Sequence, residues 1–215
     1  VGRVASIANH APDNALSSRF DYTYDEHGLR TSMTTLDGTF SYGYDALGQL
    51  TSVTLPGGRV IQYAYDAAGR RVSVTDAAIV TNYTTDLLEQ YTLVGATART
   101  YDADGNLVRE TTGGQTTTYA YDDQNRLVAV VTPAGAWTYE YDPLGNRIAT
   151  IRNAQRTDYL LDPTGLVNVV GEYDGAGSLL ARYVHSDFGL VSRLDVSGAA
   201  AYYDFDSPGS TAALT

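Results

Sequence analysis

One phrase returns along the sequence: two tyrosines separated by one residue, followed by aspartate, as in "TYAYD" at residues 118–122. The Tyr-Asp step occurs at Tyr24, Tyr44, Tyr65, Tyr101, Tyr121, Tyr141, Tyr173 and Tyr203. The gaps of 36 and 32 residues each contain a degenerate copy, "NYTTDLLEQYT" at 82–92 and "YLLDPTGLVNVV" at 159–170. The basic period is therefore 18 to 21 residues. Such a period predicts a chain built from stacked equivalent units.

The first half of each unit alternates like a strand. In "TTTYAYD" Tyr119 and Tyr121 fall on one face, and Thr118 and Ala120 fall on the other. The motif D-x-x-G follows, and an aspartate that begins a type I turn accepts hydrogen bonds from the amides ahead of it. The glycine three residues later supplies a positive φ, and Asn125 takes this position in "YDDQNRL". A hairpin turn with a bulge is expected.

A second strand and a second turn complete the unit, so one repeat is a β-hairpin. Examples of the second turn are "LDGT" at Leu36, "PGGR" at Pro56 and "TGGQ" at Thr112. Residues 1–215 then form a single segment of about ten hairpins in an all-β, antiparallel meander. Because open twisted sheets rarely exceed ~10 strands, we expect this sheet to coil into a spiral or barrel-like shell segment.

The residues expected to carry the repeat are strand-end tyrosines, turn aspartates and turn glycines or asparagine. They are Tyr24, Asp25, Gly28, Tyr44, Asp45, Gly48, Tyr65, Asp66, Gly69, Tyr101, Asp102, Gly105, Tyr121, Asp122, Asn125, Tyr141, Asp142, Gly145, Asp162, Gly165, Tyr173, Asp174 and Gly177.

The composition narrows the function classes. A net charge of −11 disfavours binding to nucleic acid or to anionic lipid. The chain has no cysteine, which excludes disulfides, thiolate catalysis and cysteine-bound metals. No apolar run approaches the ~20 residues that span a bilayer, so no membrane insertion is expected in this segment.

Several patterns resemble a calcium site or a catalytic site, and we interpret each as part of a turn or strand instead. Asp102, Asp104 and Asn106 have the start of a calcium-loop spacing, but glycine stands at 113 where the closing acid would fall. "HSD" at 185–187 places histidine, serine and aspartate side by side, where a strand points neighbours apart. The turn aspartates are needed as turn acceptors, which leaves no glycosidase-like acid pair. We therefore expect no catalytic residue, metal or cofactor, and expect Trp137 to serve packing.

The units "YDALGQLTSVT" and "YDAAGRRVSVT" resemble the YD-repeat, or Rhs (rearrangement hotspot), family. "VASIANH" resembles the lead-in to such repeats, and "YVHSDFGLVSRLD" and "YYDFDSPGSTAALT" resemble their last wall units. The resemblance covers nearly the whole chain. It implies hairpins that coil into a hollow shell, which in bacterial Rhs proteins and insecticidal toxin complexes encloses a toxic C-terminal domain. In the animal teneurins a similar barrel supports adhesion.

One departure from the family is visible. Its shells are usually closed by a segment with a self-cleaving aspartate site between paired D-P-x-G motifs. This chain has "DPLGN" at Asp142 and "DPTGL" at Asp162, in phase with ordinary repeat turns and without the intervening signature. We interpret both motifs as plain turns.

The leading hypothesis is a non-enzymatic scaffold that forms part of a shell and encloses or presents a C-terminal toxin or effector domain. The alternatives are a cell-surface adhesion or carbohydrate-binding module, with sugars stacking on tyrosine, and a self-assembling filament of YD repeats. The chain begins at Val1 and ends within "GSTAALT", so a segment of a larger exported bacterial protein, secreted or at the cell surface, is expected. The expected partners are the rest of its own polypeptide, neighbouring copies at open sheet edges, and glycans.

Overall fold

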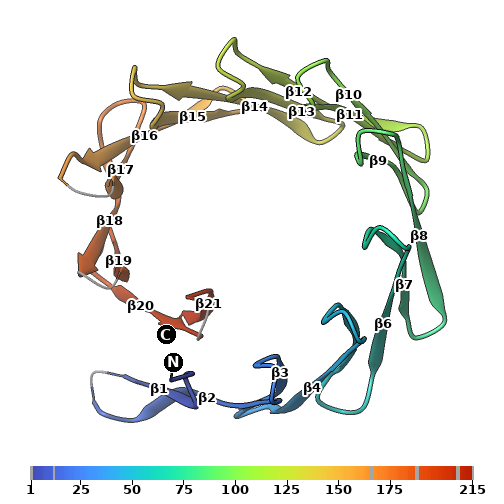
Figure 1. Cartoon of the computed structure of the whole chain (residues 1–215). Helices are drawn as coiled ribbons and strands as arrows, with labels where there is room; N and C mark the ends of the chain where they lie inside the picture. The colour runs from blue at the N-terminus through green and yellow to red at the C-terminus, as the bar shows by residue number, and fades with distance from the viewer. Residues whose placement is uncertain (1, 12, 165–166, 187–188, 207–208, 215) are drawn as a thin grey trace. The chain divides into compact units, whose positions relative to one another are not determined.

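The computed structural model describes residues 2–11, 13–164, 167–186, 189–206 and 209–214. Within these ranges there are 21 strands and no helix (Figure 1). None of the described residues forms a helix long and apolar enough to cross a membrane. The predicted all-β class is confirmed.

Contacts divide the chain into two compact units. The first contains Val1–Gly95 together with Asp204–Thr215, and the second contains Ala96–Tyr203. The strands of the first unit are β1 (Ser6–His10), β2 (Leu16–Tyr24), β3 (Arg30–Thr35), β4 (Gly38–Tyr44), β5 (Leu50–Thr54), β6 (Val60–Tyr65), β7 (Arg71–Asp76), β8 (Ile79–Thr85), β9 (Tyr91–Val94) and β21 (Thr211–Leu214). Those of the second are β10 (Thr97–Tyr101), β11 (Leu107–Thr112), β12 (Gln115–Tyr121), β13 (Leu127–Thr132), β14 (Gly135–Tyr141), β15 (Arg147–Arg152), β16 (Gln155–Asp162), β17 (Asn168–Asp174), β18 (Leu179–Ser186) and β19 (Gly189–Asp195). The last residues of β20 (Ala200–Phe205) belong to the first unit.

Strands adjacent in sequence are adjacent in the sheet. Antiparallel pairs run from β1–β2 to β8–β9 in the first unit. They run from β10–β11 to β19–β20 in the second. The predicted meander of hairpins is therefore confirmed.

Cross-strand pairs explain the tyrosine-rich composition. Tyr42 lies opposite Val53, and Tyr119 lies opposite Val130. Val130 in turn lies opposite Trp137 on the following strand. Aromatic and β-branched pairs of this kind contribute roughly 0.2–1 kcal/mol each.

Burial is slight. Among the described residues, the buried hydrophobic side chains are Phe20, Tyr22, Ala149 and Ala181, and no large side chain is fully enclosed. A sheet with so little core cannot depend on a packed interior for its stability. Contacts between neighbouring strands must supply it.

Two kinds of turn join the strands, and a wide turn replaces the two-residue kind at Leu55–Arg59, between β5 and β6. The D-x-x-G turn is wide and carries a register shift just before the strand-end tyrosine, for example between Gly43 and Tyr44. The other turn has two residues, such as Gly113 and Gly114, with φ of 57° and 81°. Asn153 and Ala154 form a turn of the second kind, with φ of 48° and 67°. Two positive φ angles are typical of a type I′ hairpin turn.

We predict that Ala154→Gly stabilises the chain by about 1 kcal/mol, because an L-residue in the left-handed region costs roughly 1–2 kcal/mol. The measurement is the free energy of unfolding in urea. Ala134→Gly, in a two-residue turn without a positive φ at residue 134, is the matched control and should give no gain. An equal gain in both variants would contradict the backbone explanation.

Candidate functional site

The candidate site is the strand end and turn that recur in every repeat. We use "YD turn" for the tyrosine that ends the strand, the aspartate after it and the next three residues. The arrangement around Asp45 is representative. Its amide donates to the carbonyl oxygen of Gln49 (3.0 Å), and its own carbonyl accepts from the amide of Gly48 (3.0 Å).

The first carboxylate oxygen of the aspartate closes the turn. Oδ1 of Asp45 accepts from the amides of Leu47 and Gln49, both at 2.9 Å. The same two bonds, to the second and fourth residues after the aspartate, occur at Asp66, Asp86, Asp102, Asp122, Asp142, Asp174 and Asp195. Asp25 makes the second of them, to the amide of Leu29 at 2.8 Å.

The second carboxylate oxygen is engaged by the side chain four residues later. Oδ2 accepts from Nε of Arg70 at Asp66 (2.7 Å) and from Nε of Arg126 at Asp122 (2.7 Å). Asparagine does the same at Asp142, where Nδ2 of Asn146 donates at 2.9 Å. These carboxylates are therefore saturated by the turn itself.

The segment with calcium-loop spacing, Asp102 to Asn106, makes the same hydrogen bonds as the other turns. Oδ1 of Asp102 accepts from the amides of Asp104 and Asn106, and Oδ2 accepts from Nδ2 of Asn106 at 3.1 Å. Across the part of the chain that the structure describes, no three His, Asp or Glu side chains are grouped to hold a metal ion.

The turn glycines occupy the left-handed region. Their φ angles are 88° at Gly28, 78° at Gly48, 82° at Gly69, 88° at Gly105, 89° at Gly145 and 84° at Gly177. Asn125 adopts 58° at the same position, and its Oδ1 accepts from Nδ2 of Asn106 in the preceding turn (2.8 Å). The degenerate copy at 82–92 places Glu89 there, with φ of 64°.

The copy that contains Asp162 is only partly visible. Oδ1 of Asp162 accepts from the amide and the hydroxyl of Thr164, at 2.8 and 2.7 Å. The predicted turn residue Gly165 lies outside the described residues.

The strand-end tyrosines have a role that the sequence reasoning missed. The hydroxyl of Tyr44 donates to the carbonyl oxygen of Arg30, and that of Tyr65 donates to the carbonyl of Leu50, both at 2.8 Å. The same bond joins Tyr121 to Leu107 (3.1 Å), Tyr141 to Leu127 (2.8 Å) and Tyr24 to Val4 (2.9 Å). Each hydroxyl therefore ties its repeat to the one before it.

The accepting carbonyl has a fixed place in the sheet. Backbone pairing of β5 with β6 runs only as far as Ser52, and Leu50 lies two residues beyond that last pair. Leu127 is likewise two residues beyond Ala129, the last residue of β13 paired with β14. The hydroxyl thus continues the bonding between hairpins where the backbone ladder stops. The signal in the sequence is the tyrosine that precedes the turn aspartate at Asp25, Asp45, Asp66, Asp122 and Asp142.

Tyr101 ends β10 opposite Leu107, and Tyr173 is the last residue but one of β17, opposite Leu179. Asp174 follows Tyr173, and its amide donates to the carbonyl of Ser178 at 2.9 Å. The remaining predicted residues therefore stand at strand ends and turns of the same kind.

Arginine guanidinium groups cover several aromatic rings. The guanidinium carbon lies 4.3 Å from the ring centroid for Arg30 over Tyr22, and 4.6 Å for Arg71 over Tyr83. In the second unit, Arg126 lies 4.9 Å from the Tyr141 ring centroid. Cation–π contacts at exposed sites contribute about 0.5–1 kcal/mol.

A carboxylate also links three strands of the second unit. Glu110 accepts from Nε of Arg99 (2.8 Å) on one oxygen and from the Tyr119 hydroxyl (2.7 Å) on the other. Desolvation and the bond to Glu110 raise the pKa of Tyr119 to about 12. Tyr119 therefore stays neutral near pH 7 and acts as a hydrogen-bond donor rather than as a base.

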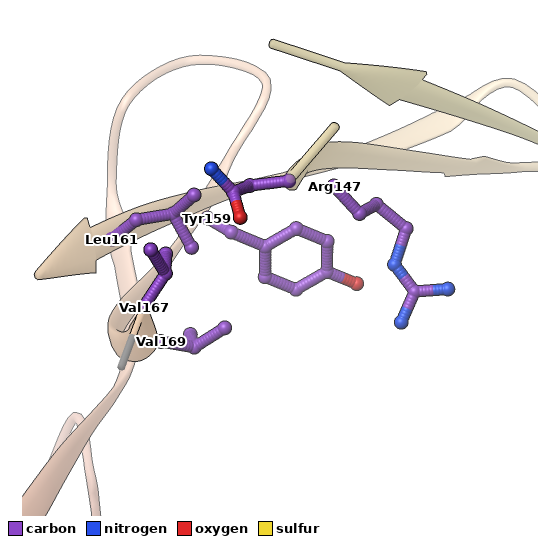
Figure 2. A pocket seen from close by; sticks show the side chains of 6 residues that line it. Arg147, Tyr159, Leu161, Val167 and Val169 are labelled. Atoms are coloured by element: carbon purple, nitrogen blue, oxygen red, sulfur yellow. The ribbon is translucent and has the colours of Figure 1, made fainter. Parts of the chain in front are cut away.

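A recess of about 190 Å³ in the second unit is lined by Asn146, Arg147, Tyr159, Leu161, Val167 and Val169. Figure 2 shows the Tyr159 ring among the aliphatic side chains, with its hydroxyl toward the Arg147 end. That hydroxyl lies 3.0 Å from Oγ1 of Thr150. The recess is below the ~300 Å³ of common ligand pockets, and we interpret it as packing around Tyr159.

The His-Ser-Asp sequence does not form a triad in the described part of the chain. Ser186 donates through Oγ to the carbonyl of Gly189 (3.4 Å), and Nδ1 of His185 is buried without a partner among the described residues. Asp187 lies outside those residues.

The last Tyr-Asp step, at Tyr203, does not begin a turn. The sequence pattern places a repeat at Tyr203, but the turn begins at Asp206, whose amide and carbonyl bond to Ser210 and Gly209. Asp204 is instead buried and accepts hydrogen bonds from the hydroxyls of Ser17 and Ser18 on β2. A further turn at Asp195 was missed because no tyrosine precedes it. The bare motif D-x-x-G, in "DVSG" and "DSPG", would have found both turns.

We predict that Tyr65→Phe lowers the free energy of unfolding by about 1 kcal/mol, because it removes one hydrogen bond between repeats. Urea unfolding measures the change. Tyr63→Phe in the same strand is the control, since no hydroxyl bond joins Tyr63 to a neighbouring repeat in the described structure. Equal losses in the two variants would exclude the inter-repeat bond as the cause.

The turn carboxylates predict acid sensitivity. Hydrogen bonds, first from the backbone amide of Arg126 and then from its guanidinium, hold the pKa of Asp122 below its ordinary value. The pKa of Asp66 is lowered in the same way by Arg70. A lowered folded-state pKa gives stability above the unfolded pKa of about 4 that is lost as pH falls through the folded pKa. We expect unfolding free energy to decline below about pH 4, and less steeply in Asp122→Asn.

The matched control is Asp123→Asn, which removes a charge from the neighbouring position of the same turn. It should leave the acid limb of the pH profile unchanged. A profile that is flat down to pH 2, or equally altered by both variants, would contradict the assignment.

Two stretches of the repeats match a known protein family. The RHS Repeat family model matches residues 44–78 and 101–136. A search of curated proteins found no match. Among solved structures, the crystal structure of TcdB2-TccC3-TEV is similar over 99% of this chain, at 15% identity and a TM-score of 0.51. A Tc holotoxin pore from Photorhabdus luminescens covers 94% of the chain at 14% identity, with a TM-score of 0.44.

The chain spans only 14% of the TcdB2-TccC3-TEV chain and 15% of the holotoxin chain. At this identity the likeness concerns the fold alone. The sequence resemblance is confirmed: residues 44–78 and 101–136 match RHS repeats, and the chain has the fold of one part of TcdB2-TccC3-TEV.

Proposed function

We propose that the chain is a wall segment of a larger, coiled β-shell that encloses or presents another domain of the same polypeptide. The observation that carries this proposal is the hydroxyl-to-carbonyl bond to the preceding repeat, which recurs at Tyr24, Tyr44, Tyr65, Tyr121 and Tyr141. A bond of this kind propagates from repeat to repeat and needs no packed core. It suits a thin wall of indefinite length.

The chemistry of the YD turns supports a structural role. Their carboxylates accept amide and side-chain donors within the turn, and their tyrosine hydroxyls donate to backbone. Groups used in this way are not available as nucleophile or general base. We infer a wall that catalyses no reaction.

The RHS repeats and the TcdB2-TccC3-TEV fold support a shell of the toxin-complex type. The enclosed domain would be a toxin or effector, and the whole protein would be exported from a bacterial cell. The chain's small share of the similar structure supports a segment within a longer polypeptide. Further repeats and the enclosed domain would be its partners.

A carbohydrate-binding surface has less support. Sugar stacking needs free aromatic faces. Guanidinium groups already lie over Trp137 (Arg152, 5.4 Å), Tyr22 and Tyr83.

We predict that the full polypeptide protects its enclosed domain from a broad-specificity protease. Time courses compare that domain alone with the same domain inside the full protein, followed by mass spectrometry. Tyr65→Phe combined with Tyr141→Phe should speed its cleavage because the wall opens more often. Tyr63→Phe is the control. Equal cleavage of the domain with and without the wall would refute enclosure.

A further inference from the structure

The residues Asp204, Phe205 and Asp206, which we call the clasp, lie against the N-terminal strands of their own unit. Contacts assign residues from Asp204 onward to the first unit, although the strands before them form the second. The boundary between the units falls inside β20. The clasp is therefore a segment that leaves one unit and docks on the other end of the sequence.

Polar contacts hold the clasp. The Asp204 carboxylate is 6% exposed, and its Oδ2 accepts from the hydroxyls of Ser17 (2.5 Å) and Ser18 (3.1 Å). Nδ2 of Asn9 donates both to Oγ of Ser18 (2.8 Å) and to the carbonyl of Phe205 (3.3 Å). A buried carboxylate is costly unless it is hydrogen-bonded. Docking of Asp204 therefore depends on the hydrogen bonds from the Ser17 and Ser18 hydroxyls.

The surface that receives the clasp also holds the two buried aromatic residues of the described chain. Ser18, Phe20 and Tyr22 alternate along β2 and so share one face. Phe20 is 7% exposed and Tyr22 is 6% exposed. We call Asn9, Ser17, Ser18, Phe20 and Tyr22 the acceptor surface.

The clasp does not fill the space next to it. A cavity of about 450 Å³ is lined by Ser17, Ser18, Arg19, Phe20, Met33, Thr35, Leu36, Asp37, Phe40 and Asp206. The hydrogen bonds of the clasp reach β1 at Asn9 and β2 at Ser17 and Ser18. A contact of this kind, next to unfilled space, can open without unfolding the strands beneath it.

We propose that the clasp is exchangeable: Asp204–Asp206 of one copy of this chain dock on the acceptor surface of a second copy. Every copy carries both parts, so reciprocal exchange reproduces the same contacts in a closed dimer. The clasp of each chain competes with the exchange because it occupies the acceptor surface of that chain. The apparent affinity between two copies is therefore the intrinsic affinity multiplied by the fraction of acceptor surfaces that are free. This proposal is independent of the shell function.

The experiment separates the two halves of the contact in the full chain. Asp204→Ala breaks the clasp and leaves a free acceptor surface. The double variant Ser17→Ala/Ser18→Ala breaks the acceptor surface and leaves a free clasp. Each variant alone should stay monomeric in sedimentation velocity at rising concentration. Their equimolar mixture should form a 1:1 dimer, at least about tenfold tighter than the wild-type dimer because no clasp of the same chain competes.

Two controls keep the result interpretable. Asp123→Ala, mixed with the same double variant, keeps its own clasp docked and should dimerise no better than the wild type. Circular dichroism and urea unfolding check that each variant folds, and Asp204→Val, which also lacks an acceptor and suits a strand, replaces Asp204→Ala if the latter does not. A monomeric mixture would overturn the proposal. So would equal growth of large assemblies in every sample, which would indicate pairing of open strand edges instead.

Discussion

The structure depends on one bond between successive hairpins, in which a strand-end tyrosine donates its hydroxyl to a backbone carbonyl of the preceding repeat. Tyr44, Tyr65 and Tyr141 make this bond at 2.8 Å. A hairpin alone is barely stable in water, and this sheet has almost no buried core. Stability must therefore come from contacts with the next repeat. Phenylalanine would keep the cross-strand packing but lose this join.

The aspartate after the tyrosine uses its carboxylate within its own turn. At Asp66 and Asp122 one carboxylate oxygen accepts hydrogen bonds from two backbone amides, and the other accepts a hydrogen bond from an arginine side chain. A carboxylate used in this way is a poor metal ligand and a poor base. The two amide bonds recur at Asp45, Asp86, Asp102, Asp142, Asp174 and Asp195, so these turns share the same local bend.

The hairpin units and most of their turns could be predicted from sequence because their causes are local. An aspartate acceptor and a residue tolerant of positive φ stand three positions apart, and the degenerate copy with Glu89 shows that the aspartate suffices to place the bend. The errors came from requiring tyrosine before aspartate. That rule found neither the turn at Asp195 nor the turn at Asp206.

The sequence by itself determined the hairpins, most of their turns and the use of the turn carboxylates as acceptors for backbone amides, because each arises within about five residues of backbone. Only the tertiary structure decided the partners of the tyrosine hydroxyls and of Asp204. The Asp204 carboxylate meets Ser17, 187 residues earlier in the chain, and no local pattern marks either residue. Contacts at that separation depend on how many repeats intervene and how the sheet bends between them, which is a property of the folded chain.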